Sequence, residues 1–202
     1  MSTSREKQQQ HSEEVRERIV SIARRVVAEE GVDALSIRRV TREMGYSPGI
    51  VYHYFESKER LLSCVLEQGY ARILAAVQPP GEHTQPDEAI RAALTRYVEN
   101  GLVWGAEYRA LMFSSSPSVL AFTSVLGESE SGPALRMLAS TLEEGVARGM
   151  FAPCDARLTA QAVWSAAFGL LARLLVERDV PEARRTRLIY REIDILLRGL
   201  RP

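Results

Sequence analysis

Apolar residues recur at three- and four-residue intervals along most of the chain, which is the period of an amphipathic α-helix. The first run is expected to begin at a Ser12 cap and to stop at Gly31, because glycine readily adopts the left-handed conformation that ends a helix. Its apolar positions are Val15, Ile19, Ile22, Val26 and Val27. Residues 1–12 are polar and are expected to form a flexible tail.

The same period predicts short helices over about 36–44 and 47–54, and a long helix that begins after Ser57. The segment "QPPGEHTQPD" (78–87) is dense in Pro and Gly and marks a break. More helices are expected beyond it, and the last two are long. No alternating strand pattern and no repeat is found in the sequence. The fold class is therefore predicted to be all-α, with an N-terminal domain over 13–74 and a larger helical domain over 75–202.

Composition limits the possible surroundings and partners of the chain. It has 26 Lys and Arg against 26 Asp and Glu, so its net charge gives no indication of a nucleic-acid partner. No uncharged apolar run reaches about 18 residues, and the N-terminus lacks the apolar run of a secretory signal. Cys64 and Cys154 are far apart and form no CxxC motif. We expect a cytoplasmic protein with reduced thiols and no membrane partner.

The stretch "MGYSPGIVYHYF" (44–55) carries the most specific local signal. Gly45 can turn the chain sharply after a helix that ends at Met44, while Ser47 can cap the next helix and Pro48 fits its first turn. The segment over about 36–55 therefore predicts a helix-turn-helix, whose second helix can enter the major groove of DNA.

The side chains of the second helix are expected to divide between two faces. Val51 and Phe55 lie four residues apart and suit an inner face. Tyr52 and His53 lie on other faces, where a phenol and an imidazole can bind phosphate or a base edge. Lys58 places a cation at the start of the next helix, against the helix dipole, which favours a nearby anion such as phosphate.

These residues resemble a known family. The stretch "RIVSIARRVVAEEGVDALSIRRVTREMGYSPGIVYHYFESKERLL", within residues 14–70, is similar to the DNA-binding domain of the TetR (tetracycline-repressor-like) family of transcriptional regulators. The resemblance implies an N-terminal helix-turn-helix domain and a larger C-terminal domain that binds a ligand and forms a homodimer. It also implies a repressor that a small, largely apolar molecule releases from a palindromic operator in double-stranded DNA.

The resemblance implies DNA contacts at positions that match the family pattern. Ser36 would touch a phosphate, Arg38 and Arg39 would reach the backbone or a base, and Tyr52, Tyr54 and Lys58 would clamp phosphates. The surface that faces the groove would consist of Ser47, Pro48, Gly49, Ile50 and His53. Ile50 and Thr41 depart from the small residues that are usual there, so the base preference does not carry over from the family.

The local charge argues for two copies on DNA. From Ser36 to Arg60 there are five Lys or Arg residues and three Glu, a net charge of plus two. One copy would bind weakly, whereas two copies on a palindrome would add their contacts. Candidates for the dimer interface in the last two helices are Ala162, Ala166, Gly169, Leu170, Leu188, Ile189, Ile193, Leu196 and Leu197. The same residues could instead form an intramolecular core, and both readings can hold together.

Large apolar side chains in the C-terminal domain could line a pocket for a small-molecule effector, or could be ordinary core residues. They are Tyr97, Trp104, Tyr108, Met112, Phe113, Phe122, Met137, Trp164 and Phe168. No catalytic constellation and no metal-ligand spacing is found in the sequence, so we expect no enzyme and no cofactor. A helical scaffold with a vestigial DNA-binding head and a small helical enzyme remain the alternative functions.

Overall fold

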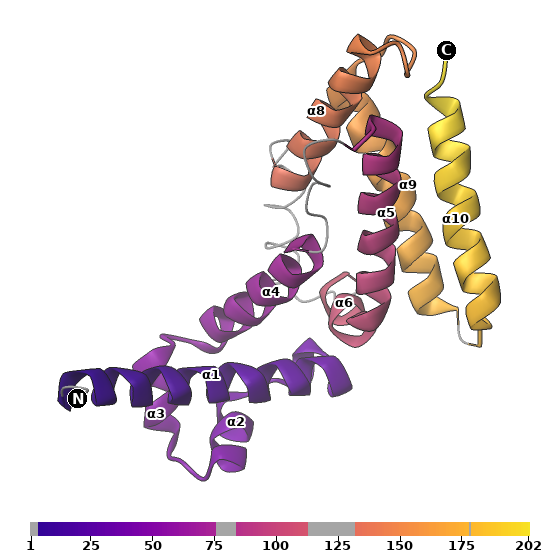
Figure 1. Cartoon of the computed structure of the whole chain (residues 1–202). Coiled ribbons are helices and arrows are strands. Elements are labelled where there is room, and N and C mark those ends of the chain that lie inside the picture. Colours follow the sequence, from indigo (N-terminus) through magenta and orange to yellow (C-terminus); the bar gives the residue numbers. More distant parts are fainter. Residues whose placement is uncertain (1–3, 76–83, 113–131, 178) are drawn as a thin grey trace. The chain divides into compact units, whose positions relative to one another are not determined.

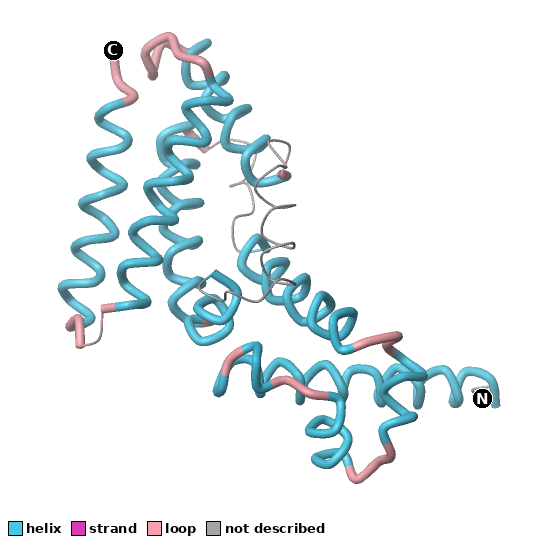
Figure 2. The backbone as a smooth tube through the Cα atoms, turned by 180° about the vertical axis from the view of Figure 1, so that it is seen from behind, coloured by secondary structure: helices cyan, strands magenta, loops and turns pink. Residues whose placement is uncertain are grey.

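The computed structural model describes residues 4–75, 84–112, 132–177 and 179–202. Within these ranges every regular element is a helix (Figures 1 and 2). The chain divides into two compact units, of which the first comprises residues 1–70 and 106–125 and the second residues 71–105 and 126–202. Helix α4 (Lys58–Ala75) contributes residues to both units.

The first unit contains α1 (Ser4–Glu30), a 3-10 turn (Val32–Ala34), α2 (Ile37–Met44), α3 (Pro48–Tyr54) and most of α4. Gly31 follows α1 with a φ of 89°, as expected for a glycine stop. The expected start at Ser12 was wrong, because α1 begins at Ser4. Residues 4–12, which we expected to form a flexible tail, are helical, since Glu, Lys and Gln are strong helix formers.

One apolar cluster holds the first unit together. Ile19, Val40 and Val51 come from three different helices and are completely buried in it. Leu61 and Leu62 of α4 are also buried there, and Ile22 packs against the cluster. The inner face expected for Val51 and Phe55 is therefore confirmed. This core fixes α2 and α3 against α1.

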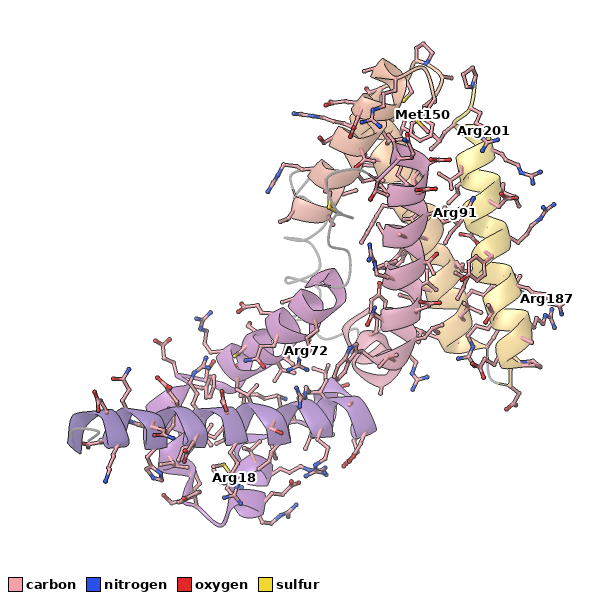
Figure 3. All side chains as sticks on the ribbon, in the orientation of Figure 1. Arg18, Arg72, Arg91, Met150, Arg187 and Arg201 are labelled. Carbon is pink, nitrogen blue, oxygen red and sulfur yellow. The ribbon has the colours of Figure 1, made fainter. Side chains whose placement is uncertain are left out.

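The second unit contains α5 (Pro86–Val103), α8 (Pro133–Ala147), α9 (Ala156–Val176) and α10 (Glu182–Gly199). Helix α9 packs against α5, α8 and α10, and α5 also packs against α10 (Figure 1). Arg91 of α5, labelled in Figure 3, pairs with Asp194 of α10 at 3.6 Å. Helix α6 (Gly105–Met112) begins in the second unit, and its remaining residues group with the first.

Helix α9 is long and apolar enough, by composition alone, to cross a membrane. Its apolar composition has another explanation in the packing, because Val163, Ala167 and Leu171 are buried inside the unit. The three neighbouring helices account for the apolar residues on the buried side of α9, whereas Leu158 and Val176 on the helix are exposed.

Candidate nucleic-acid interface

The turn between α2 and α3 is built as the sequence predicted. Gly45 ends α2 with a φ of 72° and donates its backbone N–H to the carbonyl oxygens of Arg42 and Thr41. Ser47 occupies the N-cap position of α3 and Pro48 its first turn. The Ser47 hydroxyl forms no capping hydrogen bond, so it caps by backbone conformation alone. Its oxygen and proton are therefore not committed to the helix.

The outer face of α3, which we define as Ser47, Pro48, Gly49, Tyr52 and His53, is exposed to solvent. Tyr52 keeps 56% of its surface exposed. A Cβ atom at Gly49 would meet only the Ser47 hydroxyl, at 3.9 Å, so the surface is open there. An exposed helix with a bare first turn can approach a DNA groove closely.

Two predicted contact residues of α3 are less accessible. Ile50 is half-buried and packs against the core of the first unit. Tyr54 is also half-buried; its phenol oxygen accepts a hydrogen bond from Ser12 at 3.3 Å, and its ring meets His53 edge to face. Both side chains thus contribute to packing, whatever they contact outside the chain.

Helix α2 presents its exposed side opposite the core. Ile37, Val40 and Met44 are buried, whereas Arg38 and Arg42, one turn apart, are exposed. Ser36 caps α2 by accepting the backbone N–H of Arg39 at 3.3 Å, which leaves its hydroxyl proton available to a phosphate. Sequence reasoning left Arg42 out of the predicted site, although its four-residue spacing from Arg38 signals the shared face.

Thr41 departs from the family pattern and proves to be a core residue. It is 2% exposed, and its hydroxyl donates to the carbonyl oxygens of Ile37 at 3.1 Å and Arg38 at 3.2 Å. The hydroxyl is therefore satisfied within the helix and takes no part in the outer surface.

Arg39 is occupied by carboxylates. Its two terminal nitrogens pair with the two oxygens of Glu30, and its Nε lies 3.5 Å from Glu43. Arg25 of α1 pairs with Glu43 and, at 3.2 Å, with Glu29. We call these five residues the α1–α2 ion network. The hydrogen bond from Arg39 holds the pKa of Glu30 below its ordinary value, and the same bond raises the pKa of Arg39.

The start of α4 lies next in the chain after α3. Lys58 is half-buried there, and the Ser57 hydroxyl accepts the backbone N–H of Arg60 at 3.2 Å. Tyr46, in the turn before α3, is 44% exposed and was missed by sequence reasoning. An aromatic residue inside a three-residue turn between two helices is a signal that could have identified it.

The predicted ligand residues are only partly brought together. The rings of Tyr97 and Trp164 pack in a tilted arrangement with centroids 4.4 Å apart, and Arg72 lies over the Trp104 ring at 5.2 Å. Phe168 is half-buried on α9. Tyr108 and Met112 are on α6, in the part that groups with the first unit. Phe113 and Phe122 lie outside the described residues.

A small apolar cavity lies between α5, α8 and α9, with a volume of about 20 Å³ for a water-sized sphere. Met137 and Trp164, both predicted, line it together with Ile90 and Leu94. Three alanines, Leu138 and Thr141 supply the rest of its wall. Sequence reasoning missed these residues because nothing distinguishes them from other core positions.

The predicted dimer residues divide between the core and the surface. Leu170, Ile189, Ile193 and Leu197 are buried within the unit. Ala162 and Gly169 are exposed, and Ala166, Leu188 and Leu196 are half-buried. The prediction missed three apolar side chains that are more than half exposed on the same two helices, namely Leu158, Val176 and Ile195.

Glu192 of α10 is half-buried, which disfavours its ionised form. Partial burial raises the pKa of Glu192, and the nearby Arg173 of α9 offsets only part of that effect. Among the described residues, no group of three or more His, Cys, Asp or Glu side chains could hold a metal ion.

Comparison with known proteins finds sequences similar to this helix-turn-helix region. Residues 19–65 match the family model of bacterial regulatory proteins, tetR family. The HTH-type transcriptional regulator UidR of Escherichia coli K12 is 34% identical over 74 residues, which are 37% of this chain and 38% of UidR. The HTH-type transcriptional repressor AcnR of Corynebacterium diphtheriae is 33% identical over 66 residues, or 33% of this chain and 35% of AcnR.

The likeness of the whole fold extends further than that of the sequence. A regulatory protein in the tetR family from Rhodococcus RHA1 superimposes with a TM-score of 0.70 at 24% identity, covering 93% of this chain and 97% of that protein. Matches to curated relatives span less than two fifths of UidR and AcnR. Over residues 19–65, this chain is therefore similar to the bacterial regulatory proteins of the tetR family.

Proposed function

We propose that the chain is a sequence-specific transcriptional regulator that binds a palindromic operator as a homodimer and acts as a repressor. It would work in the cytoplasm and carry out no catalysis. The observation that carries the proposal is the outer face of α3, which is exposed, has a bare Gly49 and stands on a fully buried Val51. A rigid core beneath an open helix is what insertion into a major groove requires.

Contacts with phosphate would come from Tyr52 on that face and from residues on the neighbouring helices. Arg38 is exposed on α2, and Tyr52 is the most exposed aromatic residue of α3. The Ser36 hydroxyl retains its proton for donation, and Lys58 lies at the start of α4. These groups position a protein on DNA without reading sequence, whereas the first turn of α3 would meet the base edges.

A homodimer would form through the exposed side of α9 and α10. Leu158, Ala162 and Gly169 of α9 fall on one stripe, and Ile195 of α10 is 56% exposed. Apolar and small residues in that position favour close helix packing across a two-fold axis. Two α3 helices would then need a separation of about 34–36 Å, or a multiple of one turn, to enter successive major-groove faces.

The effector would be a small, largely apolar molecule bound in the second unit. The cavity lined by Met137 and Trp164 contains no charged side chain, so it offers no counter-charge to an ionic ligand. At about 20 Å³ it would have to widen to admit an effector. Helix α4 has residues in both units and is the element through which binding could alter the DNA-binding end. The ligand must prefer the state that does not bind DNA, since otherwise it shifts nothing.

The test uses a palindromic duplex from upstream of the coding sequence and a mixed-sequence duplex of equal length. We expect the wild-type protein to bind the palindrome at least about a hundredfold more tightly at moderate salt, with two chains per duplex. Equal affinity for both duplexes would reject the regulator and favour the helical scaffold. Replacing Tyr52 by Phe should weaken binding to both duplexes similarly.

A further inference from the structure

We infer that Arg39 is a positioning residue of the helix-turn-helix, which braces α2 against α1 through Glu30 and Glu43 and does not itself bind DNA. The inference rests on the proposed function and assigns Arg39 a different task from that of its neighbour Arg38. The two arginines are adjacent in sequence but lie in different surroundings.

Helical geometry separates the two side chains. Residues four apart share a face, so Arg38 lies with Arg42, and Arg39 lies with Glu43. The face of Arg38 and Arg42 is opposite the buried Val40 and is exposed. The flank of Arg39 instead meets the C-terminal end of α1, where Glu30 is the last helical residue.

The Arg39 guanidinium lies between two carboxylates; its terminal nitrogens are hydrogen-bonded to one of them, whereas Nε only approaches the other. The two terminal nitrogens engage Glu30 in a fork, which is the strongest geometry for an arginine pair, and Nε lies 3.5 Å from Glu43. A phosphate would have to displace these oxygens and approach two negative charges. The Arg38 side chain, by contrast, takes part in no hydrogen bond or ion pair found among the described residues.

The network joins the flanks of α1 and α2, in addition to the buried core that already packs the two helices together. Arg39 and Glu43 lie on α2, whereas Arg25, Glu29 and Glu30 lie on α1. Because Ser36 caps α2 and Arg38 lies on it, a small rotation of α2 about its buried face would displace both proposed phosphate contacts. Binding constellations lose affinity when their support allows displacements of about 1 Å.

The experiment compares Arg39→Gln, Glu30→Gln and the double variant with Arg38→Gln as the matched control, all in the full chain. Affinity for the palindromic duplex is measured over a range of salt concentrations. We expect Arg39→Gln and Glu30→Gln each to weaken binding by about two- to fivefold, with no further loss in the double variant. Their salt slopes should match the wild type, whereas Arg38→Gln should lower the slope by about 0.9 for each lost phosphate contact.

The direction in which Glu30→Gln changes the affinity for DNA decides whether Arg39 braces α2 or contacts DNA. Removing a negative charge near DNA would tighten binding if Glu30 acted only through its charge, whereas the brace requires weaker binding. Tighter or unchanged binding by Glu30→Gln, together with a lower salt slope for Arg39→Gln, would overturn the inference and make Arg39 a DNA contact.

A second measurement keeps this result separate from the proposed function. If the wild-type protein does not discriminate the palindrome, the regulator hypothesis fails. The brace can still be tested by urea unfolding of the wild type, Arg39→Gln, Glu30→Gln and the double variant. Non-additive midpoints for positions 30 and 39 would support the brace. Additive midpoints would overturn it, even if DNA binding is specific.

Discussion

The hydroxyl of Ser12 on α1 donates to the phenol oxygen of Tyr54 on α3 at 3.3 Å, so the end of the helix-turn-helix is tied to the first helix. Tyr52, two residues earlier, points outward and is 56% exposed. The two tyrosines of the "YHY" motif therefore have different roles, which sequence alone does not reveal.

These roles predict opposite results for two Tyr→Phe variants. Tyr54→Phe removes the hydrogen bond and should reduce the free energy of unfolding by about 0.5–1.5 kcal/mol. Tyr52→Phe should leave that free energy unchanged and weaken DNA binding. Urea denaturation and DNA titration of both variants check the prediction, and a stability loss in Tyr52→Phe would contradict it.

Two glycines of the helix-turn-helix, Gly45 and Gly49, form a second matched pair. Gly45 has a φ of 72°, so Gly45→Ala forces a left-handed conformation on a residue with a Cβ and should destabilise the unit by about 1 kcal/mol. Gly49 is helical with open space around it, so Gly49→Ala should fold normally. The added methyl at position 49 should nevertheless weaken binding to the palindrome, because it stands on the face that approaches DNA. Unchanged affinity of Gly49→Ala for the palindrome would mean that DNA contacts a different surface of the protein.

The dimer surface can be tested at Gly169, where an added Cβ would meet nothing within 4 Å inside one chain. Gly169→Gln should therefore leave the protomer folded while it obstructs close packing with a second copy. We expect a monomer in analytical ultracentrifugation and a loss of at least about tenfold in affinity for the palindrome. Ser140→Gln, on the exposed side of α8, is the control and should remain a dimer. A dimeric Gly169→Gln protein would place the interface elsewhere.

Glu192 predicts a dependence of stability on pH. Burial raises its pKa in the folded state above 4.5, so its protonated form stabilises the fold at low pH and that contribution is lost as pH rises through the folded pKa. Glu192→Gln, which never ionises, should thus be more stable than the wild type at pH 7, by about 0.5 kcal/mol or less because solvent screens the group. The difference should vanish below pH 4.5. Thermal unfolding at both pH values measures it, and equal stability at pH 7 would count against the burial effect.

The sequence predicted those features of the fold that depend on residues close together in the chain. Gly45 and Pro48 fix the turn through backbone conformation, and Val51 with Phe55 marks the inner face by spacing alone. The pairing of Arg39 could not be predicted, because Glu30 is nine residues away and reaches it only through the angle between α1 and α2. The same holds for Ile195, whose exposure depends on which side of α10 meets α5 and α9.

The early start of α1 has a consequence for Ser12. Because Ser12 lies inside a continuous helix, the backbone N–H groups that follow it donate to carbonyl oxygens of the preceding turn. The Ser12 hydroxyl is therefore available to Tyr54. If the chain were trimmed to begin near residue 12, the first amides of the shortened helix would lack acceptors and would compete for that oxygen. The length of the segment before Ser12 would then decide whether its hydroxyl caps α1 or hydrogen-bonds to Tyr54 of α3.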